Sequence, residues 1–125
     1  MPGFRTFEEI DAWKAGRSLT RSVYSVTSVG PFQRDFALRD QIRRAAISVT
    51  SNIAEGFERD RRAEFIQFLR YAKGSAGEVR SQLYVALDEG YINREEFGDL
   101  HGQAMDAIRL IQGLRRYLEK QRRSE

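Results

Sequence analysis

The chain has 125 residues, 41% of them hydrophobic, which is enough for one domain with a hydrophobic core. It contains no cysteine, which excludes disulfides and thiolate metal sites and fits a reducing cytoplasm. No apolar stretch approaches bilayer-spanning length and the N-terminus has no signal-peptide core, so we expect a cytoplasmic protein without a membrane partner. The net charge is +3, and all but three of the 21 basic residues are arginines. Arginine suits phosphate recognition, but GC-rich codon usage would give the same bias.

The first predicted helix covers residues 7–28. Its start is marked by the capping box from Thr6 to Glu9, in which each residue's side chain can bond the other's backbone amide. Apolar or small residues then recur every three or four positions, and Gly30 and Pro31 end the segment.

The second predicted helix covers residues 35–58, although its centre also fits another structure. Residues 47–50 alternate apolar and polar side chains, as in a half-buried strand. However, Ile42, Ala46, Val49 and Ile53 repeat at intervals of four and three, which place them on one face of a helix and not of a strand. We therefore expect a helix, with Asp60 as the N-cap of the next one.

The third and fourth helices are predicted at residues 61–89 and 94–120. Both carry unbroken heptad-like apolar spacing, and Gly90 and Asn93 supply a C-cap and an N-cap between them. Four such helices with short connections predict an all-α fold, an antiparallel up-down-up-down four-helix bundle that forms a single domain over residues 1–125.

A polar stripe runs beside the apolar face of the second helix. We expect its hydrogen-bonding side chains to form a polar seam with the third helix, because buried amides and carboxylates need partners. The third helix carries Gly74 and Gly77, which would let the two backbones approach closely. The alternative is a solvated polar flank. The seam residues are Gln41, Ser48, Asn52, Glu55 and Glu78.

No catalytic or metal-binding constellation is evident. A di-iron bundle needs Glu-x-x-His pairs, but the only histidine is His101 and Gly98 precedes it by three positions. The chain has no Gly-x-Ser-x-Gly motif and no phosphate-cradling glycine loop. We therefore expect no catalytic residue, no metal, no cofactor and no enzyme activity.

Two long stretches resemble a known family. They read LRDQIRRAAISVTSNIAEGFER and EFIQFLRYAKGSAGEVRSQLYVALDEGYI, and the resemblance extends from Phe4 to Leu118. The family is named for proteins encoded in intervening sequences of 23S ribosomal RNA genes and is often labelled S23 ribosomal protein. Its members look like antiparallel four-helix bundles that assemble into ring-shaped homopentamers.

A related branch of this family is the accessory protein of diversity-generating retroelements. That branch forms a positively charged barrel that binds nucleic acid and a reverse transcriptase. The resemblance thus implies a reverse transcriptase as a partner only where one is encoded nearby.

Several large apolar side chains lie outside the four predicted core stripes. A single bundle core uses an arc of about a hundred degrees on each helix, so these residues predict contacts between copies of the chain. The alternative is scattered surface aromatics. The residues are Trp13, Tyr24, Ile47, Phe57, Phe68, Tyr84, Leu110 and Tyr117.

Basic residues cluster in the turn between the second and third helices and in the second half of the fourth. Antiparallel packing brings these two segments to the same end of the bundle, where they would form a positive pole for phosphate groups. The predicted nucleic-acid-binding residues are Arg59, Arg61, Arg62, Arg109, Arg115, Arg116, Lys120, Arg122 and Arg123.

Two hypotheses about function follow. The first is a non-enzymatic oligomeric scaffold that binds RNA or DNA through the positive pole. The second is a purely structural or protein-binding oligomer, in which the basic ends of helices only compensate the helix dipoles.

Overall fold

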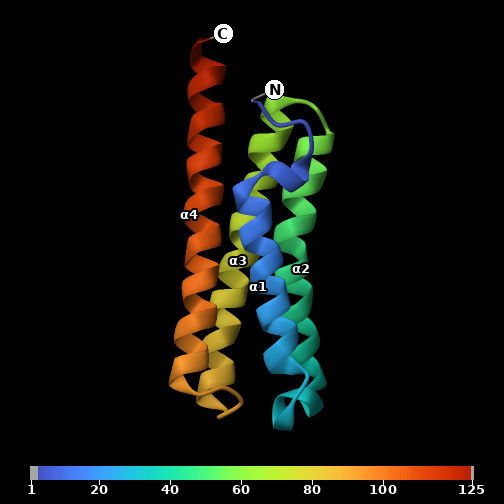
Figure 1. Ribbon diagram of the computed structural model, residues 1–125, viewed down its shortest axis with the longest axis vertical. Helices are drawn as coiled ribbons and strands as arrows, with labels where there is room; N and C mark the ends of the chain where they lie inside the picture. Colours follow the sequence, from blue (N-terminus) through green and yellow to red (C-terminus); the bar gives the residue numbers. More distant parts are fainter. Residues whose placement is uncertain (1–2, 125) are drawn as a thin grey trace.

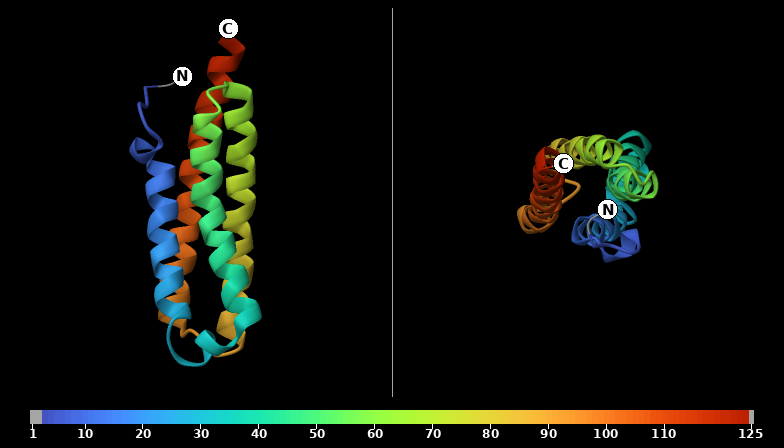
Figure 2. Two further views of the ribbon diagram at one scale, coloured as in Figure 1. Left: turned by 90° about the vertical axis from the view of Figure 1, so that its right-hand side faces the viewer. Right: turned by 90° about the horizontal axis from the view of Figure 1, so that it is seen from above.

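The computed structural model describes the backbone of residues 3–124 and the side chains of residues 3–121. The four helices are α1 (Asp11–Thr27), α2 (Phe36–Glu58), α3 (Arg62–Asp88) and α4 (Arg94–Ser124), with short 3-10 turns η1 (Phe7–Glu9) and η2 (Gly30–Arg34). Successive helices run in opposite directions, so the start of α1, the α2–α3 turn and the end of α4 share one end of the bundle (Figures 1 and 2). Residues 3–124 contain no strand, which confirms the all-α bundle and the helical assignment of residues 47–50.

The first helix begins later than the capping box suggested. Glu9 accepts hydrogen bonds from the backbone amides of Arg5 and Thr6 at 2.7 and 2.9 Å, and these bonds lower the pKa of its carboxyl. However, the box stabilises only η1, because Ile10 is extended (φ −77°, ψ 120°) before α1 starts at Asp11. Ile10 is 1% exposed, so the break places this side chain in the core.

The other helix ends follow the sequence signals with one exception. Asn93 and Glu96 form a reciprocal capping box at the start of α4, and Gly90 adopts φ +74° at the end of α3, as expected. The prediction that Asp60 caps α3 is wrong: Asp60 has φ +56° and occupies the turn, and Arg61 is the N-cap residue.

The core fills the whole length of the bundle with the heptad-spaced residues. Leu19, Ile53, Leu69 and Ile111, one from each helix, have no exposed surface. The apolar spacing therefore identified the buried face of every helix correctly.

Close helix packing occurs at glycines other than those expected. A Cβ atom at Gly56 would lie 2.6 Å from the Cβ of Phe68, and one at Gly16 would lie 3.0 Å from Val49. A Cβ at Gly74 or Gly77 would meet no atom within 4 Å, so the expectation that these two bring α3 close to α2 is wrong.

The polar seam between α2 and α3 exists, but with different partners. Ser75 donates to Ser48 at 2.9 Å, and Gln82 donates to Gln41 at 3.3 Å. Ser48 also accepts a hydrogen bond from the amide of Asn52 in its own helix.

Three of the predicted seam residues do not bridge the two helices as expected. Asn52 bonds Ser48 within α2, Glu55 pairs with Arg59, the C-cap residue of α2, at 2.9 Å, and Glu78 is exposed. The carboxylates of Glu55 and Glu78 lie on the solvent-exposed side of their helices. The seam is therefore formed by hydroxyl and amide groups.

His101 lies in the seam between α3 and α4. Its Nε2 accepts a hydrogen bond from Nε of Arg80 at 3.2 Å, and its ring stacks on Phe97 with 5.2 Å between centroids. Tyr84 packs edge-on to it at 5.8 Å. Partial burial, and secondarily the charge of Arg80, lower the pKa of His101 below its ordinary value of 6.5.

We expect the two kinds of glycine to respond oppositely to alanine. Gly56→Ala should lower the free energy of unfolding by about 1–3 kcal/mol, because the new methyl group overpacks against Phe68. Gly77→Ala should raise it by about 0.5–1 kcal/mol, because the site is open and alanine favours the helix. Urea unfolding followed by circular dichroism at one protein concentration measures both, and equal midpoints for the two variants would contradict this packing.

We also expect His101 to make stability depend on pH. The unfolded chain takes up the imidazole proton near pH 6.5, whereas the folded chain does so only at lower pH. This contribution to stability is therefore complete above pH 6.5 and is lost as pH falls through the lower folded-state pKa. Unfolding midpoints at pH 7.5 and 5.5 should differ less in His101→Gln than in the wild type. An unchanged difference would show that other groups cause the dependence.

Candidate nucleic-acid interface

The two predicted basic clusters lie at the same end of the bundle. The α2–α3 turn carries one cluster, and α4, which carries the other, extends past this turn (Figure 1). We call this end the basic pole and define it by Arg59, Arg61, Arg62, Arg115, Arg116 and Lys120. Arg122 and Arg123 belong to the last turns of α4 but lie outside the residues whose side chains the structure describes.

Carboxylates compensate much of the charge at the α2–α3 turn. Arg59 pairs with Glu55 at 2.9 Å and with Glu64 at 3.3 Å, and its guanidinium also lies 5.2 Å from the ring centroid of Phe68. The hydrogen bond with Glu55 is the main cause that raises the pKa of Arg59. Arg61 lies 3.8 Å from Glu64. Arginines 59 and 61 are thus partly neutralised by acids from the flanking helices.

The α4 side of the basic pole combines one ion-paired arginine with two exposed basic residues. Arg115 and Arg70 share Glu119, at 3.1 and 3.5 Å, while Arg116 and Lys120 are exposed. The last turns of α4 extend beyond the ends of the other helices (Figure 2).

Arg109 does not belong to the basic pole. It pairs with Asp106 one helical turn away and lines a cavity between α1 and α4, with Ala15 and Leu110, nearer the middle of the bundle. The fourth-helix cluster is therefore divided between the pole and the side of the bundle.

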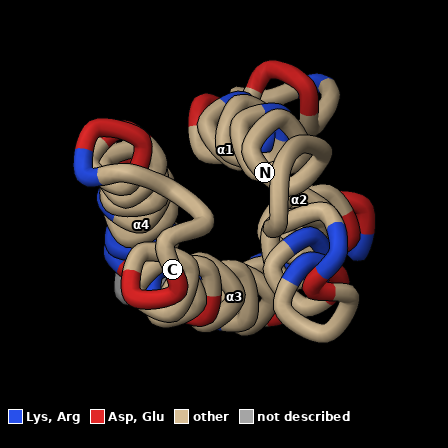
Figure 3. Tube along the Cα trace, turned by 90° about the horizontal axis from the view of Figure 1, so that it is seen from below, with Lys and Arg blue, Asp and Glu red and all other residues tan. Residues whose placement is uncertain are grey.

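The opposite end of the bundle is rich in acids. Glu95 and Glu96 lie in the first turn of α4, and Asp88 is the last residue of α3; both helix ends are at this end of the bundle (Figure 3).

Sequence reasoning missed a set of arginines that lie against aromatic rings. Arg43 lies 4.4 Å from the ring centroid of Tyr24, Arg39 lies 4.8 Å from Phe36, and Arg17 lies 5.7 Å from Trp13. Two of these contacts join residues three or four positions apart in one helix, a spacing visible in the sequence. The contact of Arg43 with Tyr24 joins α2 to α1 and has no such signal.

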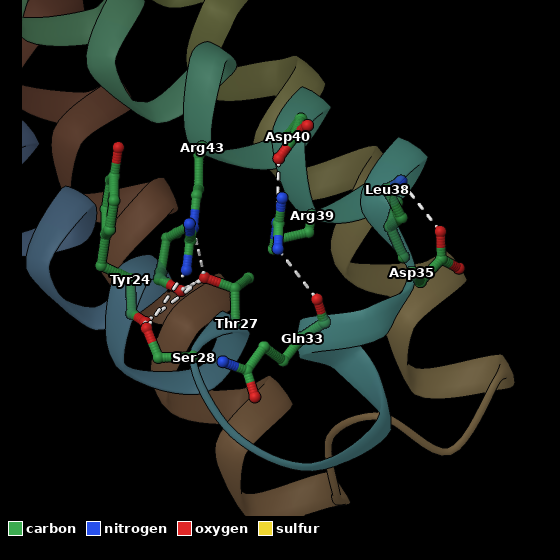
Figure 4. Close-up of polar contacts among 10 residues, drawn as sticks. Tyr24, Thr27, Ser28, Gln33, Asp35, Leu38, Arg39, Asp40 and Arg43 are labelled. Atoms are coloured by element: carbon green, nitrogen blue, oxygen red, sulfur yellow. Dashed lines mark hydrogen bonds and ion pairs between the residues drawn. The ribbon is translucent and has the colours of Figure 1, made fainter.

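Arg43 is held in place without a carboxylate. Its Nε donates to Oγ1 of Thr27 at 2.8 Å and its Nη2 donates to Oγ of Ser28 at 3.1 Å (Figure 4). By contrast, its neighbour Arg39 bonds Asp40 at 2.9 Å. Arg43 is therefore a fixed positive charge that neutral groups orient.

Other kinds of site find no support in the described part of the chain. Among these residues no group of three His, Asp or Glu side chains is arranged to hold a metal ion. None of the helices, over the residues described, has an apolar stretch long enough to cross a bilayer.

Comparison with known proteins agrees with this architecture. A crystal structure of a protein of unknown function from the S23 ribosomal protein family of Bacteroides thetaiotaomicron superposes with a TM-score of 0.77 at 24% identity, over 84% of this chain and 95% of the other. A comparison with curated proteins gave no match. The profile of a family described as 23S rRNA-intervening sequence protein matches residues 8–113, and the chain therefore belongs to that family.

Proposed function

We propose that the protein is a non-enzymatic homo-oligomeric scaffold that binds RNA or DNA through the phosphate backbone. The observation that carries this proposal is the basic pole, in which Arg116 and Lys120 of α4 are exposed at the same end of the bundle as the α2–α3 turn. Phosphate contacts by such side chains supply affinity without reading sequence. A ring of identical subunits, a pentamer in the resemblance noted above, would repeat the basic pole on one side.

The oligomeric part of the proposal rests on large apolar side chains at the surface. Tyr71, Tyr84, Val85 and Tyr117 are each 46–51% exposed, and Leu110 is 40% exposed. Burial of such groups between subunits is a common basis of stable assembly.

The same exposed groups support the second candidate, a structural or protein-binding oligomer whose basicity plays no part in binding. The ion pairs of Arg59 and Arg115 favour this reading, because arginines already paired with carboxylates attract phosphate less strongly. Nucleic-acid binding and its salt dependence separate the two candidates.

RNA binding should depend on the exposed basic residues near the end of α4. We expect a fluorescent single-stranded RNA of mixed sequence to bind at 50 mM salt, and to bind roughly tenfold or more weakly at 200 mM. The double variant Arg116→Gln/Lys120→Gln should reduce the magnitude of the slope of log K against log salt by about 1 per residue removed. Fluorescence anisotropy measures both quantities.

The matched control removes two exposed arginines at the other end of the molecule, Arg34→Gln/Arg94→Gln, and should leave binding nearly unchanged. No binding at 50 mM salt, or equal loss in both double variants, would contradict the nucleic-acid role of the pole and leave the structural oligomer.

The assembly itself is tested by mass. Multi-angle light scattering at tens of micromolar should give a multiple of the 14.5 kDa of one chain, and a fivefold mass for the pentamer. A mass of one chain would contradict the scaffold.

A further inference from the structure

The seam between α1 and α4 is open along its length. Three cavities of about 250, 450 and 220 Å³ follow one another along it and share residues: the first two share Arg109 and Leu110, and the last two share Gln103. They form one continuous groove, the α1–α4 groove. From residue 12 to residue 25 of α1 the groove is about 20 Å long, at 1.5 Å per residue.

The groove exists because α1 turns small side chains toward α4. These are Ala15, Ser18, Ser22 and Ser25, and they leave the space that larger side chains would fill. One hydrogen bond crosses the groove, from Ser22 to Gln103 at 3.1 Å.

The rim of the groove is acidic. Asp11 lies at one end, Asp106 in the middle, and Asp99 and Glu96 at the other end. Among the lining residues described, Arg109 is the only basic one and pairs with Asp106, and Lys14 of α1 lies 3.9 Å from Asp11. The apolar floor, with Leu110 40% exposed, is thus framed by an excess of negative charge.

The neighbouring side of the same bundle has the opposite character. The outer surface of α1 and α2 carries Arg17 and Arg21, both exposed, and Arg43, oriented by neutral groups. Between them lie apolar surfaces, Tyr24 at 39% and Ile47 at 41% exposure. We call this side the α1–α2 ridge and define it by these five residues.

The charges of the ridge and of the groove lie at matching heights. The middle cavity places Asp106 beside the turn of α1 that carries Arg17. The next cavity places Asp99 beside the turn that carries Tyr24, on which Arg43 stacks. A second copy related by pure rotation, with no shift along the helices, therefore brings Arg43 opposite Asp99 and Arg17 opposite the Asp106–Arg109 pair.

The ridge lies on the α1–α2 side of the bundle and the groove on the α1–α4 side. These two sides adjoin at α1, as the arrangement of the helices shows (Figure 3). Two adjoining sides of a four-helix bundle face directions about a right angle apart. If one side of each copy contacts the adjoining side of the next, each copy is rotated by roughly a right angle relative to the last, and the contacts close into a ring of about four or five copies. Surfaces on opposite sides would instead give an open filament.

We propose that the α1–α2 ridge of one copy docks into the α1–α4 groove of the next, as the repeated contact of a closed ring. This inference rests on the oligomer proposed above and places its contact on the α1 side of the bundle; of the exposed apolar residues that support the oligomer, Leu110 takes part in it. Contact between charged rims of opposite sign fixes the register, and the apolar side chains between them exclude water.

Charge reversal tests the pairing. The ridge variant Arg17→Glu/Arg21→Glu and the groove variant Asp99→Arg/Asp106→Arg should each lower the mass measured by light scattering to that of one chain. The four substitutions combined in one chain should restore the wild-type mass, because the signs are then complementary again. This rescue separates a lost contact from misfolding.

A matched control reverses two charges away from both surfaces, Arg34→Glu/Arg94→Glu, and should keep the wild-type mass. A wild-type oligomer that persists in the ridge and groove variants would overturn this docking while leaving the proposed oligomer intact. A wild-type monomer would overturn both.

Two further outcomes would overturn the docking. The ridge variant could remain oligomeric but lose RNA binding, which would identify the ridge as a nucleic-acid surface. Alternatively, both double variants could become monomeric, with native helix content, and the combined variant could fail to reassemble.

Discussion

The close packing of α2 against α3 is the contact on which the shape of the bundle depends. Gly56 lets the two helices meet at Phe65 and Phe68, and the hydroxyls of Ser48 and Ser75 bond across the seam. The two helices are thus in close contact at Gly56, whereas α1 and α4, whose facing side chains are small, leave a groove. The bundle thus has one closed side and one open side, and the open side is where another chain can enter.

The buried faces and the number of helices could be predicted from the sequence because one physical rule decides them. A residue at every third or fourth position either meets the core or faces water, so Ile53 and Leu69 are identified without knowledge of their neighbours. Helix ends were also predictable where the signal is local, as at Asn93. The predicted start of the first helix was wrong, because Ile10 is buried in the core in an extended conformation, which interrupts the helix that the local sequence favours.

The partners of polar and basic residues could not be predicted in the same way. Whether a serine of one helix bonds a serine of the next depends on how each helix is rotated about its own axis. The heptad spacing predicts which face is buried, but not this rotation in detail. The same holds for the basic pole. The sequence shows that its arginines are neighbours, but it does not show that Glu64 of α3 forms an ion pair with Arg59. The glycines of α3 were misassigned because a helical glycine has the same sequence signature whether it faces a helix or water.

Cyclic symmetry connects the proposed contact to the proposed binding. The charge of one pole is modest, because Glu55, Glu64 and Glu119 offset several of its arginines. Rotation about an axis parallel to the helices would place every protruding α4 end on the same side of the ring, at a spacing fixed by the bundle width. A polyanion held by one pole would then encounter the next at high effective concentration, so weak sites add to a strong one. Nucleic-acid affinity should therefore follow assembly more closely than it follows the charge of any single chain.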